Sequence, residues 1–183
     1  PDKFTVVSAC QLQMRKGVLE FIDLATKMPD IQFVWAGNFA FKGISEGRKE
    51  IMEHMDDLPD NVHFLGLVER DRMNEFFNMG DVMLQLSFEE LFPMTILESM
   101  NANIPLLLRD LPEYKPILFD YYLKANSQQT FKDELTKLKE DADYYAKACE
   151  GSKRGEQFYS KESILEQWQQ FYDKVATERN LLS

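Results

Sequence analysis

Two glutamates, Glu90 and Glu98, lie eight residues apart, directly after an apolar run that reads as a buried strand. We expect Glu90 on a loop and Glu98 one to two turns into a helix, because Pro93 suits a first helical position. A loop carboxylate accepts hydrogen bonds from sugar hydroxyls, and a helix carboxylate can accept two from a ribose diol. Free amides at the helix start, near Met94 and Thr95, can hold a diphosphate. Together these groups match the parts of a nucleotide sugar.

The same two glutamates also have a plainer interpretation. Glu90 then caps a solvated loop, and Glu98 lies on an exposed helix face, where most charged residues are found. Two glutamates at this spacing are common. Spacing alone therefore leaves both interpretations open.

Composition places the chain among globular proteins and disfavours several partners. The 183 residues, 44% of them hydrophobic, suffice for one domain with its own core. Acidic residues outnumber basic ones by 31 to 21, and the net charge of −10 would repel nucleic acid. No apolar run approaches the roughly 18 residues of a transmembrane helix, and the first residues do not resemble a signal peptide. We therefore expect a cytoplasmic protein.

Strand-like apolar runs alternate with helix-like amphipathic ones along the chain. This alternation predicts an α/β fold, a Rossmann-like open parallel sheet with helices on both faces. We expect four or five βα units, with strands at 4–9, 31–36, 62–65, 82–86 and 104–108. Helices are expected at 18–28, 47–55, 70–79, from about 93 and over 128–155, whereas 117–122 fits a helix or a short strand.

The segment 160–178 reads as a helix with serine caps and one apolar face. Trp168, Phe171 and Tyr172 lie on that face, and we expect them to be part of a core. The face packs either on the sheet of this domain or on another domain of the same protein.

Four segments match the motifs of one enzyme family in the same order. The stretch 87–100 contains both glutamates and looks like a Glu-x7-Glu segment, and 8–17 is similar to a first loop that ends in Lys-Gly. Val62 to Gly66 resembles the third strand, and Ile104 to Leu106 resembles the strand after the glutamate helix. The family is that of the retaining glycosyltransferases of the GT-B fold, often called group 1 or family 4.

The resemblance implies a role for each matching residue. Glu90 would bind hydroxyls of the donor sugar and Lys16 would neutralise the diphosphate, which makes this pair the catalytic one. Glu98 would bind the ribose, and the backbone of Gly66 and Leu67 would hold the base. Lys16 as an exposed lysine and Gly66 as a simple turn glycine are the alternatives. The same motifs add Gly37, Phe92, Pro93, Met94 and Thr95 to the donor-binding residues.

The chain departs from the family in its first loop. Many members have Gly-Arg-Leu there, whereas this chain has Cys10-Gln11-Leu12, so an uncharged amide at Gln11 replaces the arginine that clamps the diphosphate. Arg15, beside Lys16, is a candidate for the missing charge. The alternative is that Arg15 points elsewhere, because adjacent residues near a helix start face different directions.

The resemblance also implies a place for the chain in a larger enzyme. Residues 1–183 would be the C-terminal, donor-binding domain, inactive without an N-terminal acceptor domain, with 160–178 as the helix that crosses back to it. The donor would be a nucleotide sugar, expected to be a UDP-hexose, used with retention and without metal or cofactor. The motifs are most similar to Gram-positive enzymes that glycosylate glucosyl-diacylglycerol, which implies a membrane glycolipid as acceptor and a membrane-associated full-length protein.

Two other classes of function stay open from the sequence. One is a non-catalytic module that binds a nucleotide sugar without transferring it. The other is a protein-interaction domain of response-regulator-like or flavodoxin-like α/β fold, although the chain lacks an acidic cluster after its first strand and a Gly-rich phosphate loop. A pyridoxal-dependent phosphorylase is disfavoured because no lysine lies in a suitable context.

Overall fold

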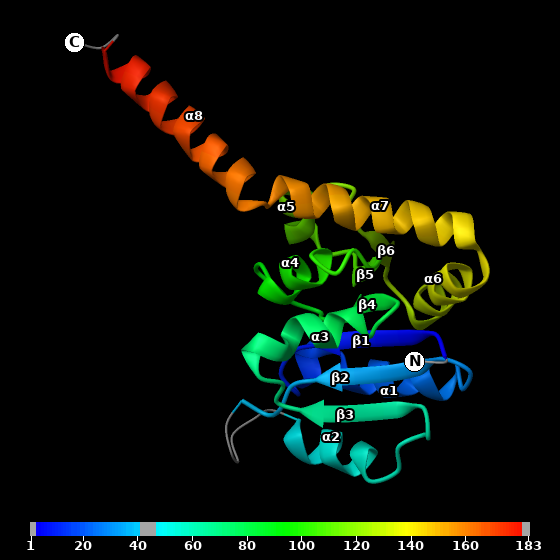
Figure 1. The fold of residues 1–183 in the computed structure, drawn as a ribbon. Coiled ribbons are helices and arrows are strands. Elements are labelled where there is room, and N and C mark those ends of the chain that lie inside the picture. Colours follow the sequence, from blue (N-terminus) through cyan, green and yellow to red (C-terminus); the bar gives the residue numbers. More distant parts are fainter. Residues whose placement is uncertain (1–2, 41–46, 181–183) are drawn as a thin grey trace.

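Six short strands form one parallel sheet in the order β3-β2-β1-β4-β5-β6 (Figure 1). The computed structural model describes residues 3–40 and 47–180. The order reverses between β1 and β4, which is the switch point where open α/β sheets bind ligands. The strands are β1 (Thr5–Ala9), β2 (Gln32–Ala36), β3 (Val62–Gly66), β4 (Val82–Gln85), β5 (Leu106–Arg109) and β6 (Leu123–Ala125).

The two faces of the sheet bury separate apolar cores, because successive strand residues point to opposite sides. In β2, Phe33 and Trp35 belong to one core, whereas Val34 belongs to the other. The first core is covered by α1 (Val18–Thr26), α2 (Arg48–Met55) and α6 (Gln128–Glu140). The second is covered by α3 (Met73–Asn78), α4 (Met94–Met100) and α5 (Lys115–Leu118).

The Rossmann-like parallel sheet with helices on both faces is therefore confirmed, with three differences in detail. A sixth strand, β6, pairs with β5 just after the range 117–122, and α5 has already ended at Leu118. The single helical range expected over 128–155 is two helices, α6 and α7 (Ala142–Phe158), because the chain turns at Asp141. The side chain of Asp141 caps α7 by accepting a hydrogen bond from the Tyr144 amide at 2.9 Å.

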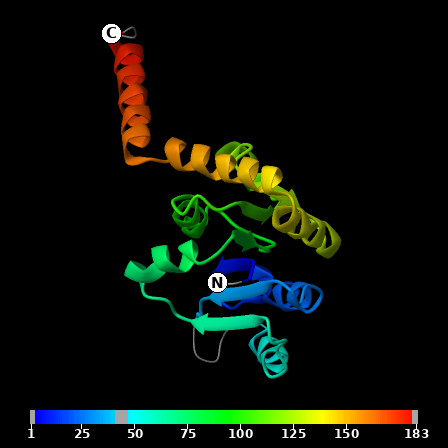
Figure 2. The same cartoon turned by 45° about the vertical axis from the view of Figure 1, so that its right-hand side comes forward.

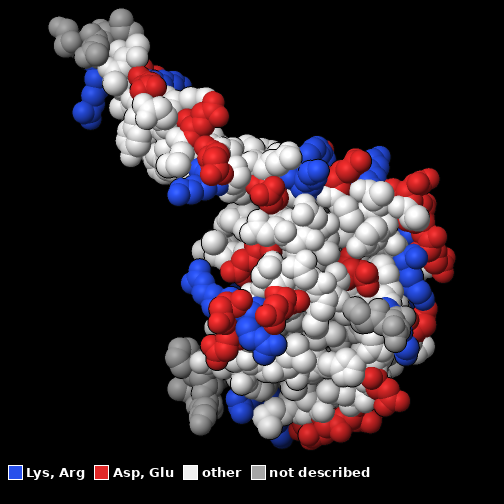
Figure 3. All heavy atoms as spheres, in the orientation of Figure 1, with Lys and Arg blue, Asp and Glu red and all other residues white. Residues whose placement is uncertain are grey.

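Helix α8 (Lys161–Asn180) leaves the end of α7 and extends away from the sheet (Figures 1 and 2). Its start is capped by the Ser160 hydroxyl, which accepts a hydrogen bond from the Ser163 amide at 3.2 Å. In this chain the helix does not cover the sheet, and Trp168, Phe171 and Tyr172 are 54%, 55% and 61% exposed. The expectation that these residues are part of a core was wrong for the described chain. Much of the surface of α8 is uncharged in Figure 3.

None of the described helices, α8 included, combines the length and apolarity needed to cross a bilayer.

The buried Trp35 stands in contrast to the exposed Trp168. Trp35 is 0% exposed, its ring lies edge-on to Phe21 at 5.0 Å between centroids, and its indole N–H donates to the Cys10 carbonyl at 2.9 Å. The two tryptophans thus report separately on the sheet domain and on α8.

We expect the two tryptophans to contribute very differently to stability. Trp35→Ala removes a filled volume from the first core and should lower the free energy of unfolding by about 3–5 kcal/mol. Trp168→Ala should change it by no more than about 0.5 kcal/mol. Urea unfolding followed by far-ultraviolet circular dichroism measures both. An equally large loss in Trp168→Ala would mean that the aromatic face of α8 is covered in solution.

Candidate functional site

A cleft of about 690 Å³ opens at the carboxyl ends of β1 and β2 and faces α4. Six of the residues expected to bind a donor line it. From α4 come Met94, Thr95 and Glu98, and from the loops after the first three strands come Gln11, Gly37 and Leu67. Glu98 therefore lies on a cleft wall at the switch point of the sheet, as a ligand-binding residue should.

Lys16 and Glu90 lie together outside the lining of this cleft. They form an ion pair between the loop after β1 and the loop after β4, with side chains only 11% and 7% exposed. Lys16 is therefore not the exposed lysine of the alternative interpretation. The Glu90 oxygen that pairs with Lys16 also accepts a hydrogen bond from the Gln85 amide at 2.8 Å.

A glycine permits the close approach of these two loops. Gly17 follows Lys16 and has φ of 74°, a conformation that side chains disfavour. A Cβ atom placed there would lie 2.6 Å from Leu86 Cβ and 2.8 Å from the Leu86 carbonyl oxygen. The Lys-Gly pair of the sequence thus has a steric cause, because the loop that carries Glu90 passes directly over Gly17.

Arg109 holds the same loop from its other side. Its Nε–H donates to the Leu86 carbonyl at 3.1 Å, and its guanidinium lies 4.2 Å from the centroid of the Phe88 ring. The guanidinium also pairs with Glu20, whose pKa is nevertheless raised by burial. The Phe88 amide in turn donates to the Arg15 carbonyl at 2.8 Å. The loop before Glu90 is therefore fixed through its backbone as well as through its carboxylate.

The remaining predicted residues lie around the cleft rather than in its lining. Arg15 has an exposed side chain and takes part through its backbone carbonyl. The Phe92 ring packs against Tyr159 at 5.6 Å between centroids. Pro93 is the residue before α4, with an extended backbone, and not the first helical residue. The Gly66 carbonyl accepts a hydrogen bond from the Gly37 amide at 2.7 Å.

Burial disfavours the ionised forms of two groups whose charge would interact with that of Glu90. Burial raises the pKa of the Cys10 thiol to about 12, although the nearby charge of Lys16 acts in the opposite direction. Burial, reinforced by the charge of Glu90, also raises the pKa of the Tyr114 phenol. Cys10 is therefore a thiol at neutral pH and not a nucleophile.

Sequence reasoning missed Arg70, which also lines the cleft. Arg70 and Glu98 are the two charged residues in the described lining. The sequence places Arg70 at the start of a helix, and the structure has a short 3-10 helix there, Arg70–Arg72. Its position four residues after Gly66, at the carboxyl end of β3, was the available signal, since such loops carry function.

Comparison with known proteins settles the family. The family model described as Glycosyl transferases group 1 matches residues 1–155. The chain belongs to this family. Its α/β sheet and the order of its motifs agree with the membership expected from the sequence.

The relatives of this group 1 glycosyltransferase chain include two lipid-modifying enzymes by name. The alpha-galactosylglucosyldiacylglycerol synthase of Streptococcus pneumoniae is 38% identical over 175 residues, covering 96% of this chain and 47% of that protein. The processive diacylglycerol alpha-glucosyltransferase of Acholeplasma laidlawii is 29% identical over 140 residues, covering 75% and 41%. The chain spans about half the length of the curated relatives it matches.

A solved structure shares the fold at low sequence identity. HepE of Anabaena, determined in complex with UDP-glucose, superposes with a TM-score of 0.77 at 16% identity. The match covers 96% of this chain and 49% of that protein. The chain thus shares its fold with about half of that protein.

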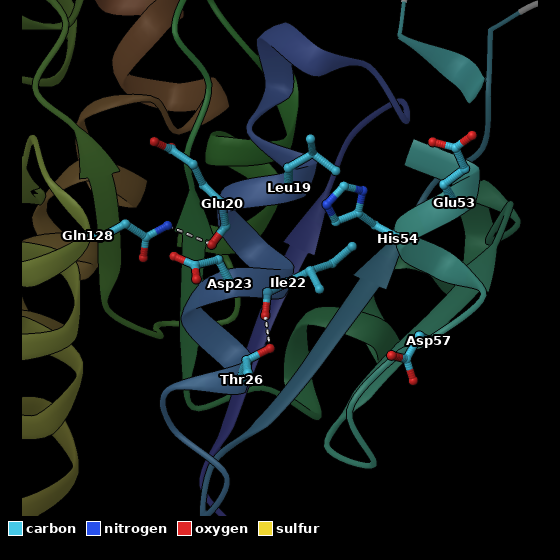
Figure 4. A pocket seen from close by; sticks show the side chains of 9 residues that line it. All are labelled: Leu19, Glu20, Ile22, Asp23, Thr26, Glu53, His54, Asp57 and Gln128. Atoms are coloured by element: carbon cyan, nitrogen blue, oxygen red, sulfur yellow. Dashed lines mark hydrogen bonds between the residues drawn. The ribbon is translucent and has the colours of Figure 1, made fainter. Parts of the chain in front are cut away.

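A second hollow, of about 730 Å³, lies between α1 and α2, two of the helices that cover the first core (Figure 4). Four carboxylate residues line it and no lysine or arginine does, among the residues the structure describes. Such a surface would repel a diphosphate. The cleft at the strand ends is therefore the site that suits a family substrate. The four carboxylates are those of Glu20, Asp23, Glu53 and Asp57.

The one Asp-x-Asp of the chain, Asp141-Ala142-Asp143, lies far along the sequence from the cleft motifs, at the junction of α6 and α7. Asp141 is occupied there as the cap of α7. Across residues 3–40 and 47–180, no cluster of three or more acidic, histidine or cysteine side chains is arranged to hold a metal ion.

Two glycines with nearly equal backbone angles allow a test of the loop contact. Gly17 and Gly66 have φ of 74° and 70°, but a Cβ at Gly66 would meet nothing within 4 Å. Gly66→Ala should therefore lower the free energy of unfolding by about 1–2 kcal/mol, the cost of the backbone conformation. Gly17→Ala should lower it by at least about 1 kcal/mol more, because the loop must move.

Urea unfolding of both variants measures this difference. Equal losses in the two variants would contradict a close contact between Gly17 and the loop that carries Glu90.

Proposed function

We propose that this chain is the donor-binding half of a retaining glycosyltransferase that moves a hexose from a UDP-sugar to a glycosyl-diacylglycerol or a similar acceptor. The observation that carries the proposal is the cleft at the switch point, where Glu98 faces the loops after three neighbouring strands in a group 1 family chain. The names of the two lipid-modifying relatives support the acceptor class. The UDP-glucose bound to HepE supports the donor class.

The nucleotide would lie along the cleft. Glu98 can accept two hydrogen bonds from the ribose diol, since an ionised carboxylate is an acceptor only. Leu67 and Val68 offer apolar surface and backbone groups to the base. The diphosphate would then point toward Met94 and Thr95 and toward Gln11, the residue at the position of the family arginine.

The sugar would extend from the diphosphate toward Glu90 and Lys16. In the reaction the bond between the anomeric carbon and the β-phosphate oxygen breaks, and UDP leaves with the bonding electron pair. The acceptor hydroxyl oxygen bonds to the same face of that carbon and gives its proton to the departing β-phosphate oxygen. Lys16 would stabilise the growing charge on the diphosphate, while Glu90 positions the sugar through its hydroxyls. Arg15 is near enough in sequence to add charge, although its side chain is exposed in the present structure.

The acceptor would be bound by a domain outside these residues. The relatives are about twice as long as the matched region, which supports an additional N-terminal domain. Helix α8 would cross back to that domain and bury its aromatic face there. The proposal includes no metal: Lys16 and Arg70 would supply the positive charge that stabilises the diphosphate.

We expect this chain to bind UDP selectively, with a dissociation constant of about 10 µM to 1 mM, because half a cleft gives modest affinity. Glu98→Ala should weaken binding of UDP by about tenfold, because two charge-assisted hydrogen bonds to the ribose are lost. Isothermal titration with UDP, ADP and GDP measures both effects. EDTA should leave the affinity for UDP unchanged.

The control is Glu53→Ala, which removes a carboxylate from the acidic hollow between α1 and α2 and should leave UDP binding unchanged. A folded chain that binds none of the three nucleotides would contradict the proposal. Binding that EDTA abolishes and Mg²⁺ restores would contradict the metal independence.

Arg70 gives a second expectation with a matched neighbour. Both arginines are exposed, but Arg70 lines the cleft, whereas Arg72 pairs with Glu75 at 3.1 Å. Arg70→Ala should weaken UDP binding about five- to tenfold, the range for one lost contact to an anionic ligand. Arg72→Ala should change it less than about twofold, since exposed ion pairs contribute little. Equal effects in the two variants would show that general charge, and not a contact in the cleft, matters.

A further inference from the structure

Gln85 is a buried polar residue in a strand that is otherwise apolar. It ends β4, a central strand with the sequence Val-Met-Leu-Gln, and its side chain is 1% exposed. Neighbouring residues of the strand, Met83 and Leu84, are 0% exposed and fill the two apolar cores. A buried amide in such a place needs partners for its donors and its acceptor.

Only one end of the Gln85 amide finds partners. Its nitrogen donates to the Ser87 hydroxyl at 3.0 Å and to Glu90 Oε1 at 2.8 Å. Its oxygen is buried without a hydrogen-bond partner among the described residues. The amide orientation is nevertheless determined, because an ionised Glu90 carboxylate only accepts hydrogen bonds and therefore needs the nitrogen.

Stability alone does not explain a glutamine at this position. An unpartnered buried carbonyl oxygen is unfavourable, whereas an apolar side chain of the same shape avoids that desolvation cost. Methionine has nearly the shape of glutamine and suits the apolar environment of β4. The benefit of Gln85 therefore lies in what its nitrogen does to Glu90.

The contacts of Glu90 are arranged on one side of its carboxylate. The hydrogen bonds that the described residues make to it, from Lys16 and from Gln85, both end on Oε1. Oε2 is left as an acceptor. Two donors on one oxygen fix the plane of the carboxylate and direct the second oxygen toward whatever binds beside it.

The two donors differ in what a bound diphosphate would do to them. Lys16 carries a mobile point charge on a flexible stem, so a diphosphate would compete with Glu90 for it. Gln85 is uncharged and buried in a strand, so it has no such competitor. Gln85 would keep Glu90 oriented while Lys16 turns to the phosphates.

We propose that Gln85 is a positioning residue for Glu90, holding one carboxylate oxygen so that the other accepts a hydroxyl of the donor sugar. This inference rests on the proposed function, because it assigns the sugar to Glu90. It predicts that Gln85 affects recognition of the sugar and not of the nucleotide. A residue needed merely for folding would affect both.

The test compares titrations with UDP and with UDP-glucose for the unmodified chain and for Gln85→Met. We expect UDP affinity to stay within about twofold, while UDP-glucose affinity falls about tenfold, since a hydrogen bond to a charged group is lost. The melting temperature of Gln85→Met should be unchanged or higher. Leu84→Met, the adjacent buried residue, is the matched control and should leave both affinities unchanged.

A second variant, Gln85→Glu, should make the affinity for UDP-glucose depend on pH. Two carboxyl groups so close cannot easily both be ionised, and the protonated one can donate to the other. The UDP-glucose affinity relative to UDP should therefore be low at about pH 8 and recover toward about pH 5.5, whereas the unmodified chain shows no such recovery.

The outcomes separate the two proposals. Absence of UDP binding by the unmodified chain would overturn the proposed function and this inference with it. UDP binding together with an unchanged preference for UDP-glucose in Gln85→Met, or in Gln85→Glu at every pH, would overturn the inference alone.

Discussion

The ion pair of Lys16 and Glu90 joins the loops that follow β1 and β4, the two strands between which the sheet order reverses. At that point the chain connections of the two neighbouring strands lead in opposite directions. The two loops are therefore free to separate unless a contact holds them together. The pair is mostly buried, and a buried charge must keep its partner. Gly17 lets the loops approach closely enough for the pair to form.

The rest of the site follows from this connection. With the loop after β4 held, α4 begins at Met94 and places Glu98 on the cleft wall opposite the loops after β1, β2 and β3. The charged lining is sparse, one glutamate and one arginine among the described residues, and the other lining side chains are apolar or uncharged polar ones such as Gln11, Asn38 and Thr95. Such a surface suits an elongated ligand with distinct polar parts. The acidic hollow between α1 and α2 lacks these features.

Helix α8, unlike the helices before it, contributes no described residue to either core of the sheet. Its aromatic residues contact each other along one face, as in the stacked pair Trp168 and Tyr172, and remain exposed to solvent in this chain. The sheet domain is complete without them, since both cores are closed by the helices that precede α8. An exposed apolar face of this kind is typical of a surface that another protein segment covers.

The sequence by itself determined the order of the elements and the identity of the family, because alternating apolar periodicity and the Glu-x7-Glu, Lys-Gly and strand motifs are local. It did not reveal β6, which is three residues long and is a strand only because it pairs with β5. Tertiary structure alone decided which site residues meet. It brought Lys16 to Glu90 across 74 positions, turned the Arg15 side chain outward, placed Arg70 in the cleft and put the Gln85 amide against Glu90. Such contacts depend on how separate loops approach in space, and no local pattern encodes that approach.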